Sequence, residues 1–220
     1  MSTRHGRLVF ALSLSLLAGA ADAGFVNPLV PEWRGGPNTN FVGWESFTSA
    51  TGGPNLPNFP GTAGNGVLFN FGPGAMITST GNMYGYAGPL YIAAFGSTLA
   101  YQSPIEVVLN VSTAGTLLDS SSVMLSFNDN LGNSATVAPS FTELRYDSPM
   151  PPPGGSVQNV AFGWNTGGLG FAATNWRLDI RSLSANMSLD AITLDFRNVP
   201  APGVCAVLGL AAFFGVRRRR

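Results

Sequence analysis

Apolar residues recur at every second position in four short stretches of this chain, and this alternation constrains its fold more than any other feature. Segment 176–181 (WRLDIR) alternates strictly between apolar and charged residues, and segments 105–111, 122–127 and 191–197 show the same period. Side chains two positions apart in an extended chain lie on one face, so each stretch predicts a strand with one buried face. The side chains expected to point inward from the first stretch are Trp176, Leu178 and Ile180, and those expected outward are Arg177, Asp179 and Arg181.

Glycine and proline separate these stretches. They number 28 and 16 among 220 residues, and no helical period of useful length appears between the two terminal segments. Such residues favour turns over helices. Further short strands are expected at residues 41–47, 67–71, 76–80, 90–95 and 156–164. Short strands spaced in this way predict an all-β fold, either an antiparallel β-sandwich or a jelly roll.

Two local features refine this prediction. Leu189 lies on the opposite parity from the apolar residues of segment 191–197, so a bulge is expected near Asp190 and Ala191. The proline- and glycine-rich stretch 149–155 is too short for a domain linker, and we expect it to cap one end of the sandwich.

Residues 199–220 combine a proline motif, an apolar segment (204–216) without charges, and four arginines. A helix over the apolar segment would span about 21 Å, against about 30 Å for the hydrocarbon core of a bilayer. Local thinning and the long arginine stems reduce this deficit, so we expect a short transmembrane helix with the arginines on the cytoplasmic side. The alternative is a buried core helix with a basic tail. The proline motif consists of Val199, Pro200, Ala201, Pro202 and Gly203. The arginine cluster consists of Arg217, Arg218, Arg219 and Arg220.

This arrangement resembles the bacterial PEP-CTERM sorting signal, in which a Pro-x-Pro motif, a brief transmembrane helix and an arginine cluster are read by an exosortase. The resemblance covers Val199 to Arg220, and Ala201 stands where the commonest form has glutamate. It implies export, transient anchoring in the membrane, cleavage near the proline motif by an exosortase-like enzyme, and delivery to the cell surface or extracellular matrix. It implies nothing about the activity of the delivered domain.

The first residues predict a secretory signal peptide. Two arginines precede the apolar stretch 8–17, and Ala21 and Ala23 form an A-x-A site for signal peptidase before Gly24. The chain is therefore expected to divide into a signal peptide (1–23), a β-sandwich domain (24–198) and a sorting signal (199–220).

The formal charge of zero conceals an acidic domain. Six of the 11 arginines and one of the 11 acidic residues lie in the terminal segments, which leaves the domain at about −5 without any lysine. A negative domain argues against nucleic acid as a partner. His5 and Cys205, the single His and Cys of the chain, also lie in the terminal segments. Their position excludes nucleophiles and zinc sites built on His or Cys from the domain.

Carboxylates remain as candidates for catalysis, because paired acids hydrolyse glycosidic bonds. The available glutamates are Glu45, Glu106 and Glu143, and none lies in a recognisable catalytic motif. Glu106 is expected on the solvent face of its strand. We therefore expect no enzymatic activity, with an extracellular glycosidase or lyase that uses paired carboxylates as the alternative.

Calcium is the metal considered for the domain, because hard cations bind oxygen ligands. Asp129 lies in an Asn-Asp-Asn turn that lacks the spacing of an EF-hand and is also ordinary turn chemistry. Asp190 lies in segment 188–192, which resembles the last strand of some carbohydrate-binding jelly rolls, where an acidic residue helps to hold a structural calcium. No other cofactor is expected.

Aromatic residues could provide flat surfaces for sugar rings, although most aromatic side chains belong to protein cores. Tyr84 and Tyr86, flanked by Gly81 and Gly88, are the best exposed candidates for a ligand platform. We thus expect an exported structural or adhesive protein of the surface or matrix that binds polysaccharide weakly. A permanently tail-anchored membrane protein is a further alternative.

Overall fold

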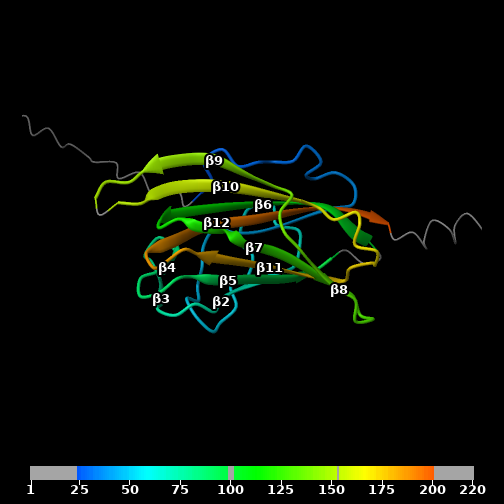
Figure 1. Ribbon diagram of the computed structural model, residues 1–220, viewed down its shortest axis with the longest axis horizontal. Coiled ribbons are helices and arrows are strands. Elements are labelled where there is room, and N and C mark those ends of the chain that lie inside the picture. Colours follow the sequence, from blue (N-terminus) through cyan, green and yellow to red (C-terminus); the bar gives the residue numbers. More distant parts are fainter. Residues whose placement is uncertain (1–23, 99–101, 153, 201–220) are drawn as a thin grey trace, which may run out of the picture.

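The computed structural model describes residues 24–98, 102–152 and 154–200, and within them all regular structure is β-strand. Two antiparallel sheets pack against each other (Figure 1). In this view β9, β10, β6 and β12 run one below another in the upper part, and β7, β11 and β5 lie below them. The prediction of an all-β antiparallel sandwich is confirmed.

Sheet A has the strand order β3-β4-β12-β6-β10-β9, and β1 also pairs with β12. Since β6 pairs along the other side of β12, β1 and β4 share one edge of that strand. The strands of this sheet are β1 (Thr39–Trp44), β3 (Ala75–Ile77), β4 (Met83–Gly85), β6 (Gln102–Gly115), β9 (Phe141–Pro149), β10 (Ser156–Asn165) and β12 (Met187–Pro200).

Sheet B has the strand order β2-β5-β11-β7-β8. Its strands are β2 (Val67–Asn70), β5 (Tyr91–Ser97), β7 (Leu118–Asn128), β8 (Ser134–Val137) and β11 (Asn175–Ser182). The chain crosses between the sheets from β5 to β6 to β7 and again from β10 to β11 to β12, a connection pattern of jelly-roll sandwiches.

The core lies between the sheets, and the predicted parity of β11 is confirmed. Trp176, Leu178 and Ile180 are at most 2% exposed and belong to the core cluster. The indole of Trp176 lies against Gly96 of the neighbouring strand, where a Cβ atom would stand 2.4 Å from Cζ2. Glycine at this position therefore allows the largest side chain of β11 to enter the core.

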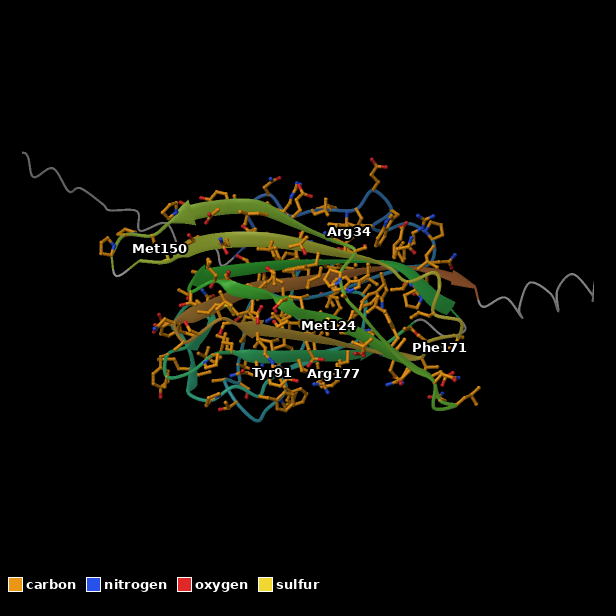
Figure 2. The ribbon with its side chains drawn as sticks, viewed as in Figure 1. Arg34, Tyr91, Met124, Met150, Phe171 and Arg177 are labelled. Atoms are coloured by element: carbon orange, nitrogen blue, oxygen red, sulfur yellow. The ribbon has the colours of Figure 1, made fainter. Side chains whose placement is uncertain are left out.

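The expected bulge in the last strand is also present. The pairing of β12 with β6 shifts register between Leu189 and Ala191, so Asp190 is the inserted residue. Of the stretch between β9 and β10, the structure describes residues 150–152 and 154–155, where Met150 N donates to the carbonyl oxygen of Gly155. Met150 lies at one end of the sandwich, as expected (Figure 2).

Three strands, β4, β8 and β9, were not expected, because they are short or lie at the edge of a sheet. β4 is three residues long, and β8 and β9 are edge strands. Six of the nine residues of β9 are exposed, so its sequence lacks the alternation that a half-buried strand requires. The strand expected at 76–80 is shorter, because β3 ends at Ile77.

A segment without regular structure, residues 24–38, lies across the outer face of sheet A, and we call it the strap. Val26 N donates to Asn159 Oδ1 at 3.0 Å. Leu29 N donates to Asn110 Oδ1 at 2.7 Å, and Asn110 Nδ2 donates back to the carbonyl oxygen of Leu29 at 3.0 Å. These bonds give polar partners to two asparagines that are only 1% exposed, although Asn159 Nδ2 has no hydrogen-bond partner among the described residues.

The strap also carries Arg34, whose guanidinium binds Asp195 of β12 in a bidentate ion pair with two contacts of 2.5 Å. The side chain of Asp195 is 0% exposed. Burial raises the pKa of this carboxyl, and the hydrogen bonds from Arg34 act in the opposite direction. Arg34 thus compensates a charge that sheet A could not otherwise bury.

The predicted signal peptide and the predicted transmembrane helix lie outside the described residues. Among residues 24–98, 102–152 and 154–200, no helix is long and apolar enough to cross a membrane. Two residues of the predicted sorting motif, Val199 and Pro200, belong to β12, where they pair with Ser103 and Gln102.

Candidate ligand-binding face

The outer face of sheet B carries an unusual combination of partly exposed aromatic, charged and hydroxyl side chains. Most come from outward positions on their strands, because the alternate residues point into the core, and Phe71 directly follows β2. We call this surface the sheet B face. It consists of Phe69, Phe71, Tyr91, Phe95, Ser122, Met124, Ser126, Thr136, Arg177, Asp179 and Arg181.

Four of these residues form a continuous aromatic shelf. Phe69 and Phe71 are stacked, with ring centroids 5.8 Å apart and an interplanar angle of 14°. Phe95 meets Phe69 edge-on at 6.1 Å, and Tyr91 meets Phe71 at 5.9 Å. Phe71 is 56% exposed, which is more than a purely structural aromatic residue normally shows.

A charged cluster lies beside the shelf on β11. Arg177 donates to both carboxylate oxygens of Asp179, at 2.7 and 2.6 Å, and its Nη2 donates to the Tyr91 hydroxyl at 2.9 Å. The Tyr91 hydroxyl in turn donates to Asp179 Oδ1 at 2.9 Å. Figure 2 shows Tyr91 and Arg177 together in the lower part of the molecule. The hydrogen bonds to Asp179 raise the pKa of the Arg177 guanidinium, against the opposing effect of partial burial.

Both arginines of the face lie over aromatic rings. The guanidinium carbon of Arg177 is 5.0 Å from the ring centroid of Phe95, and that of Arg181 is 4.4 Å from the centroid of Tyr91. Cation–π contacts of this length hold the guanidinium planes against the shelf.

Two hollows extend the face on either side of Arg177, which lines both. One has a volume of about 540 Å³ and is lined by Tyr91, Asp179, Arg181 and the hydroxyl groups of β7 and β8. The other has a volume of about 640 Å³ and is lined by Phe95, Ser97 and three asparagines, which are Asn65, Asn128 and Asn175. Volumes of this size suit one or two rings of a small-molecule or polymer ligand.

The face combines flat apolar rings with fixed hydrogen-bond donors and acceptors. Residues 24–98, 102–152 and 154–200 contain neither His nor Cys. Flat apolar rings beside fixed donors and acceptors match ligands that have both an apolar face and many hydroxyl groups.

The two tyrosines expected to form a ligand platform, Tyr84 and Tyr86, lie in and directly after β4 of sheet A, away from the sheet B face. Tyr84 is a partly buried residue of β4 whose hydroxyl donates to Asn186 Oδ1 at 2.8 Å, and Tyr86 is 54% exposed. Tyr84 lines a separate hollow of about 480 Å³ with the turns around Gly115, Gly155 and Asn186. Three tryptophans, Trp44, Trp164 and Trp176, are buried and offer no exposed ring surface.

The two aspartates considered for calcium lie on different sheets. Asp129, in the β7–β8 turn, accepts hydrogen bonds from Leu131 N, Asn133 N and Asn133 Nδ2. The side-chain bond from Asn133 is the main cause of the lowered pKa of Asp129, which fits turn chemistry. In the described part of the chain, no three Asp, Glu, His or Cys residues form a group that could hold a metal ion.

Asp190 is more constrained. Its Oδ1 accepts from Asn82 Nδ2 at 2.7 Å and from Ser188 Oγ at 2.8 Å. Burial raises the pKa of Asp190 to about 6, although the bond from Ser188 acts in the opposite direction. The Oδ1 atom of Asn82 is buried near the bulge without a hydrogen-bond partner among the described residues.

The glutamates considered for catalysis are placed as follows. Glu106 forms an exposed ion pair with Arg197 at 3.1 Å, in agreement with its expected solvent position, and Glu143 pairs with Arg145 on β9 at 2.5 Å. Glu45 directly follows β1 and is partly exposed.

Sequence reasoning assigned Arg177, Asp179 and Arg181 correctly to the outside but did not recognise the face. Tyr91 and Phe95 are four residues apart on β5, and Phe69 and Phe71 are two apart, so each pair shares a face. This signal was present in the sequence. The pairing of β2, β5 and β11, which brings the four rings together, was not.

No family model matches this chain, and no curated protein matches it. Among solved structures, it is similar to a carbohydrate-binding module that recognises mannan specifically, at 10% identity and a TM-score of 0.28, covering 59% of this chain and 88% of that one. It is also similar to a module specific for non-crystalline cellulose, at 14% identity and a TM-score of 0.31, covering 70% and 86%. Both TM-scores are low, so neither similarity carries an argument about function.

Proposed function

We propose that the β-sandwich is a non-catalytic glycan-binding domain, and that it binds polysaccharide through the sheet B face. The observation that carries the proposal is the aromatic shelf, with Phe71 56% exposed, directly beside the cluster of Arg177, Asp179 and Tyr91. Sugar rings have an apolar face that packs on aromatic rings and an edge of hydroxyl groups that bonds to charged side chains.

The cluster supports this role because it is rigid before any ligand arrives. Arg177, Asp179 and Tyr91 fix one another through four hydrogen bonds. Groups that are already ordered lose little conformational entropy on binding. A partly exposed face nevertheless buries less of a ligand than a closed pocket, so we expect a dissociation constant on the order of 10 µM to 1 mM.

We also propose that this domain is exported and delivered to the cell surface or extracellular matrix, where glycan binding gives it an adhesive or structural role. The proposal rests on the signal peptide predicted for residues 1–23 and on the similarity of residues 199–220 to the PEP-CTERM signal. Signal peptidase and an exosortase-like enzyme would then be its processing partners, and its contact with the membrane would be transient.

Replacement of Phe71 with alanine tests the glycan-binding proposal. Loss of the most exposed ring of the shelf should weaken binding about tenfold, which corresponds to about 1.4 kcal/mol. Leu144→Ala is the matched control, since Leu144 is 55% exposed but lies on β9 of sheet A. Affinity is measured by calorimetry against polysaccharides that a glycan array selects.

Equal loss of glycan affinity in both variants would contradict the assignment of the binding site to the sheet B face. Absence of binding to every glycan on the array would remove the function itself. Hydrolysis of a bound glycan, abolished by Glu→Gln at Glu45, Glu106 or Glu143, would establish the enzymatic alternative instead.

A further inference from the structure

Arg181 is the one arginine of the described residues that forms no ion pair with a carboxylate. The other four are paired at distances of 2.5 to 3.1 Å: Arg34 with Asp195, Arg145 with Glu143, Arg177 with Asp179, and Arg197 with Glu106. A domain with twice as many acidic residues as arginines offers many partners, so an unpaired guanidinium is unexpected.

The nearest carboxylate on its own strand already accepts hydrogen bonds from other donors. Asp179 lies two residues from both Arg177 and Arg181 and therefore on the same face as each. Its Oδ2 accepts from Arg177 Nε, and its Oδ1 accepts from Arg177 Nη2 and from the Tyr91 hydroxyl. Arg177 and Tyr91 thus occupy the acceptor that Arg181 could otherwise use.

The nearest carboxylate on the next strand accepts hydrogen bonds from a serine. Asp119 of β7 lies opposite Arg181 in the sheet register. Its Oδ1 accepts from both the backbone N and the hydroxyl of Ser121, at 3.0 and 2.6 Å. Arg181 instead lies over the ring of Tyr91, on the strand at the other side of β11.

The position of the free guanidinium determines what it can bind. Tyr91 contacts Phe71, so the cation lies at the end of the shelf on which a sugar ring would pack. Arg181 also lines the hollow of about 540 Å³ together with Ser126 and Thr136. These two hydroxyl groups share one hydrogen bond, which leaves one hydroxyl hydrogen free to donate to a sugar. An arginine recognises a carboxylate through two parallel hydrogen bonds, a geometry that a neutral hydroxyl cannot reproduce.

We propose that the ligand of the sheet B face is a carboxylated polysaccharide, with the carboxylate of a uronic acid unit bound to Arg181 while its ring packs on Tyr91 and Phe71. This inference rests on the proposed glycan-binding function and names the class of glycan. Two carboxylates, Asp119 and Asp179, line the same hollow, and Asp179 is neutralised by its ion pair with Arg177. Charges further than about 8 Å away are screened at physiological ionic strength.

The test compares one polymer in two chemical forms. A polyuronate, such as polygalacturonate, and the same polymer with its carboxylates reduced to primary alcohols are titrated against the purified protein at low and physiological salt. The wild type should bind the polyuronate at least about tenfold more tightly than the reduced form. Arg181→Gln should abolish this preference, so that the variant binds both polymers with similar affinity.

Arg197→Gln is the control, because it makes the same change of charge on sheet A at a partly exposed arginine. It should retain the preference. Thermal unfolding confirms that both variants are folded. Equal binding of the two polymers by the wild type, or a preference that survives in Arg181→Gln, would overturn the inference and leave the glycan-binding function in place. Binding of dextran sulfate without binding of polyuronate would also overturn it, and failure to bind any glycan would remove both proposals.

Discussion

Single residues of this sandwich show how burial sets the charge state of a carboxylate. Asp190 and Asp195 both lie on β12, and burial raises the pKa of each. Asp195 has a bidentate arginine partner, whereas Asp190 has only the neutral donors Asn82 and Ser188. Neutral donors compensate a buried charge less completely than an ion pair does, so Asp190 titrates near neutral pH.

Replacement of Asp190 with asparagine should therefore stabilise the domain at neutral pH. The pKa of Asp190 is about 6 in the folded protein, against an ordinary value of 3.8 for the unfolded chain, so the folded protein binds more protons between these values. Its contribution to the free energy of unfolding falls as the pH rises from about 4 to about 6 and stays low above that range. At pH 8 the variant should gain up to about 3 kcal/mol, and at pH 4 the difference should vanish. Urea unfolding at the two pH values measures this.

A gain of the same size at both pH values would contradict this explanation. The calcium expected at Asp190 can be tested with the same variant. If Asp190 holds calcium, millimolar Ca²⁺ should raise the Tm of the wild type at pH 8 and leave that of Asp190→Asn unchanged.

Residue-level predictions from the sequence succeeded where parity alone decided them. The inward triplet of β11 and the bulge at Asp190 both follow from a period of two. The shelf and the state of Arg181 depend on which strands are neighbours, and strand order is not encoded in local periodicity. Tyr84 and Tyr86 were preferred because flanking glycines suggested exposure, and the structure places a larger aromatic group on the other sheet.

At the scale of elements, the strap makes the two outer faces of the sandwich different. Residues 24–38 supply hydrogen bonds and an ion pair to sheet A, so Asn110, Asn159 and Asp195 are buried there although they point away from the core. Sequence periodicity could not predict this, because the strap has no regular structure and its partners are more than 80 positions away along the chain.

Replacement of Arg34 with methionine should destabilise the domain by about 3–5 kcal/mol at pH 7, because it leaves the buried Asp195 carboxylate without a partner. The loss should shrink as the pH falls, since Asp195 then takes up a proton. Chemical unfolding measures both effects. The double variant Arg34→Met, Asp195→Asn should recover most of the stability, and failure of the second change to recover any would show that the strap acts through packing alone.

At the scale of the whole molecule, β12 links the sandwich to the proposed sorting signal. The strand begins near β4 and, on the right of Figure 1, ends at Pro200. Fourteen residues of strand extend over about 45 Å, so the last paired residue lies far from the first. The all-β class and most strands followed from composition and alternation, while the terminal segments lie outside the described residues and their roles remain predictions.

The position of β12 constrains where processing can occur. The last residues of β12, which are Asn198, Val199 and Pro200, pair with β6. Cleavage before Pro200 would therefore remove paired residues from sheet A. We expect intact-mass measurement of the mature protein to give an N-terminus at Gly24 and a C-terminus at Pro200 or later. A C-terminus before Asn198 would contradict the proposal, and protein that stays in the membrane fraction with residues 204–220 attached would indicate permanent anchoring.

The aromatic shelf runs across β5 and β2 at the side of the sandwich, and not at the end where β12 stops. A long polymer could therefore pass one molecule and continue to the next. Many weakly binding copies along one strand of polymer would hold it with an avidity that no single copy has, and each copy could still detach and rebind. Such a protein would act as a reversible crosslinker, whose strength depends on how densely it is displayed.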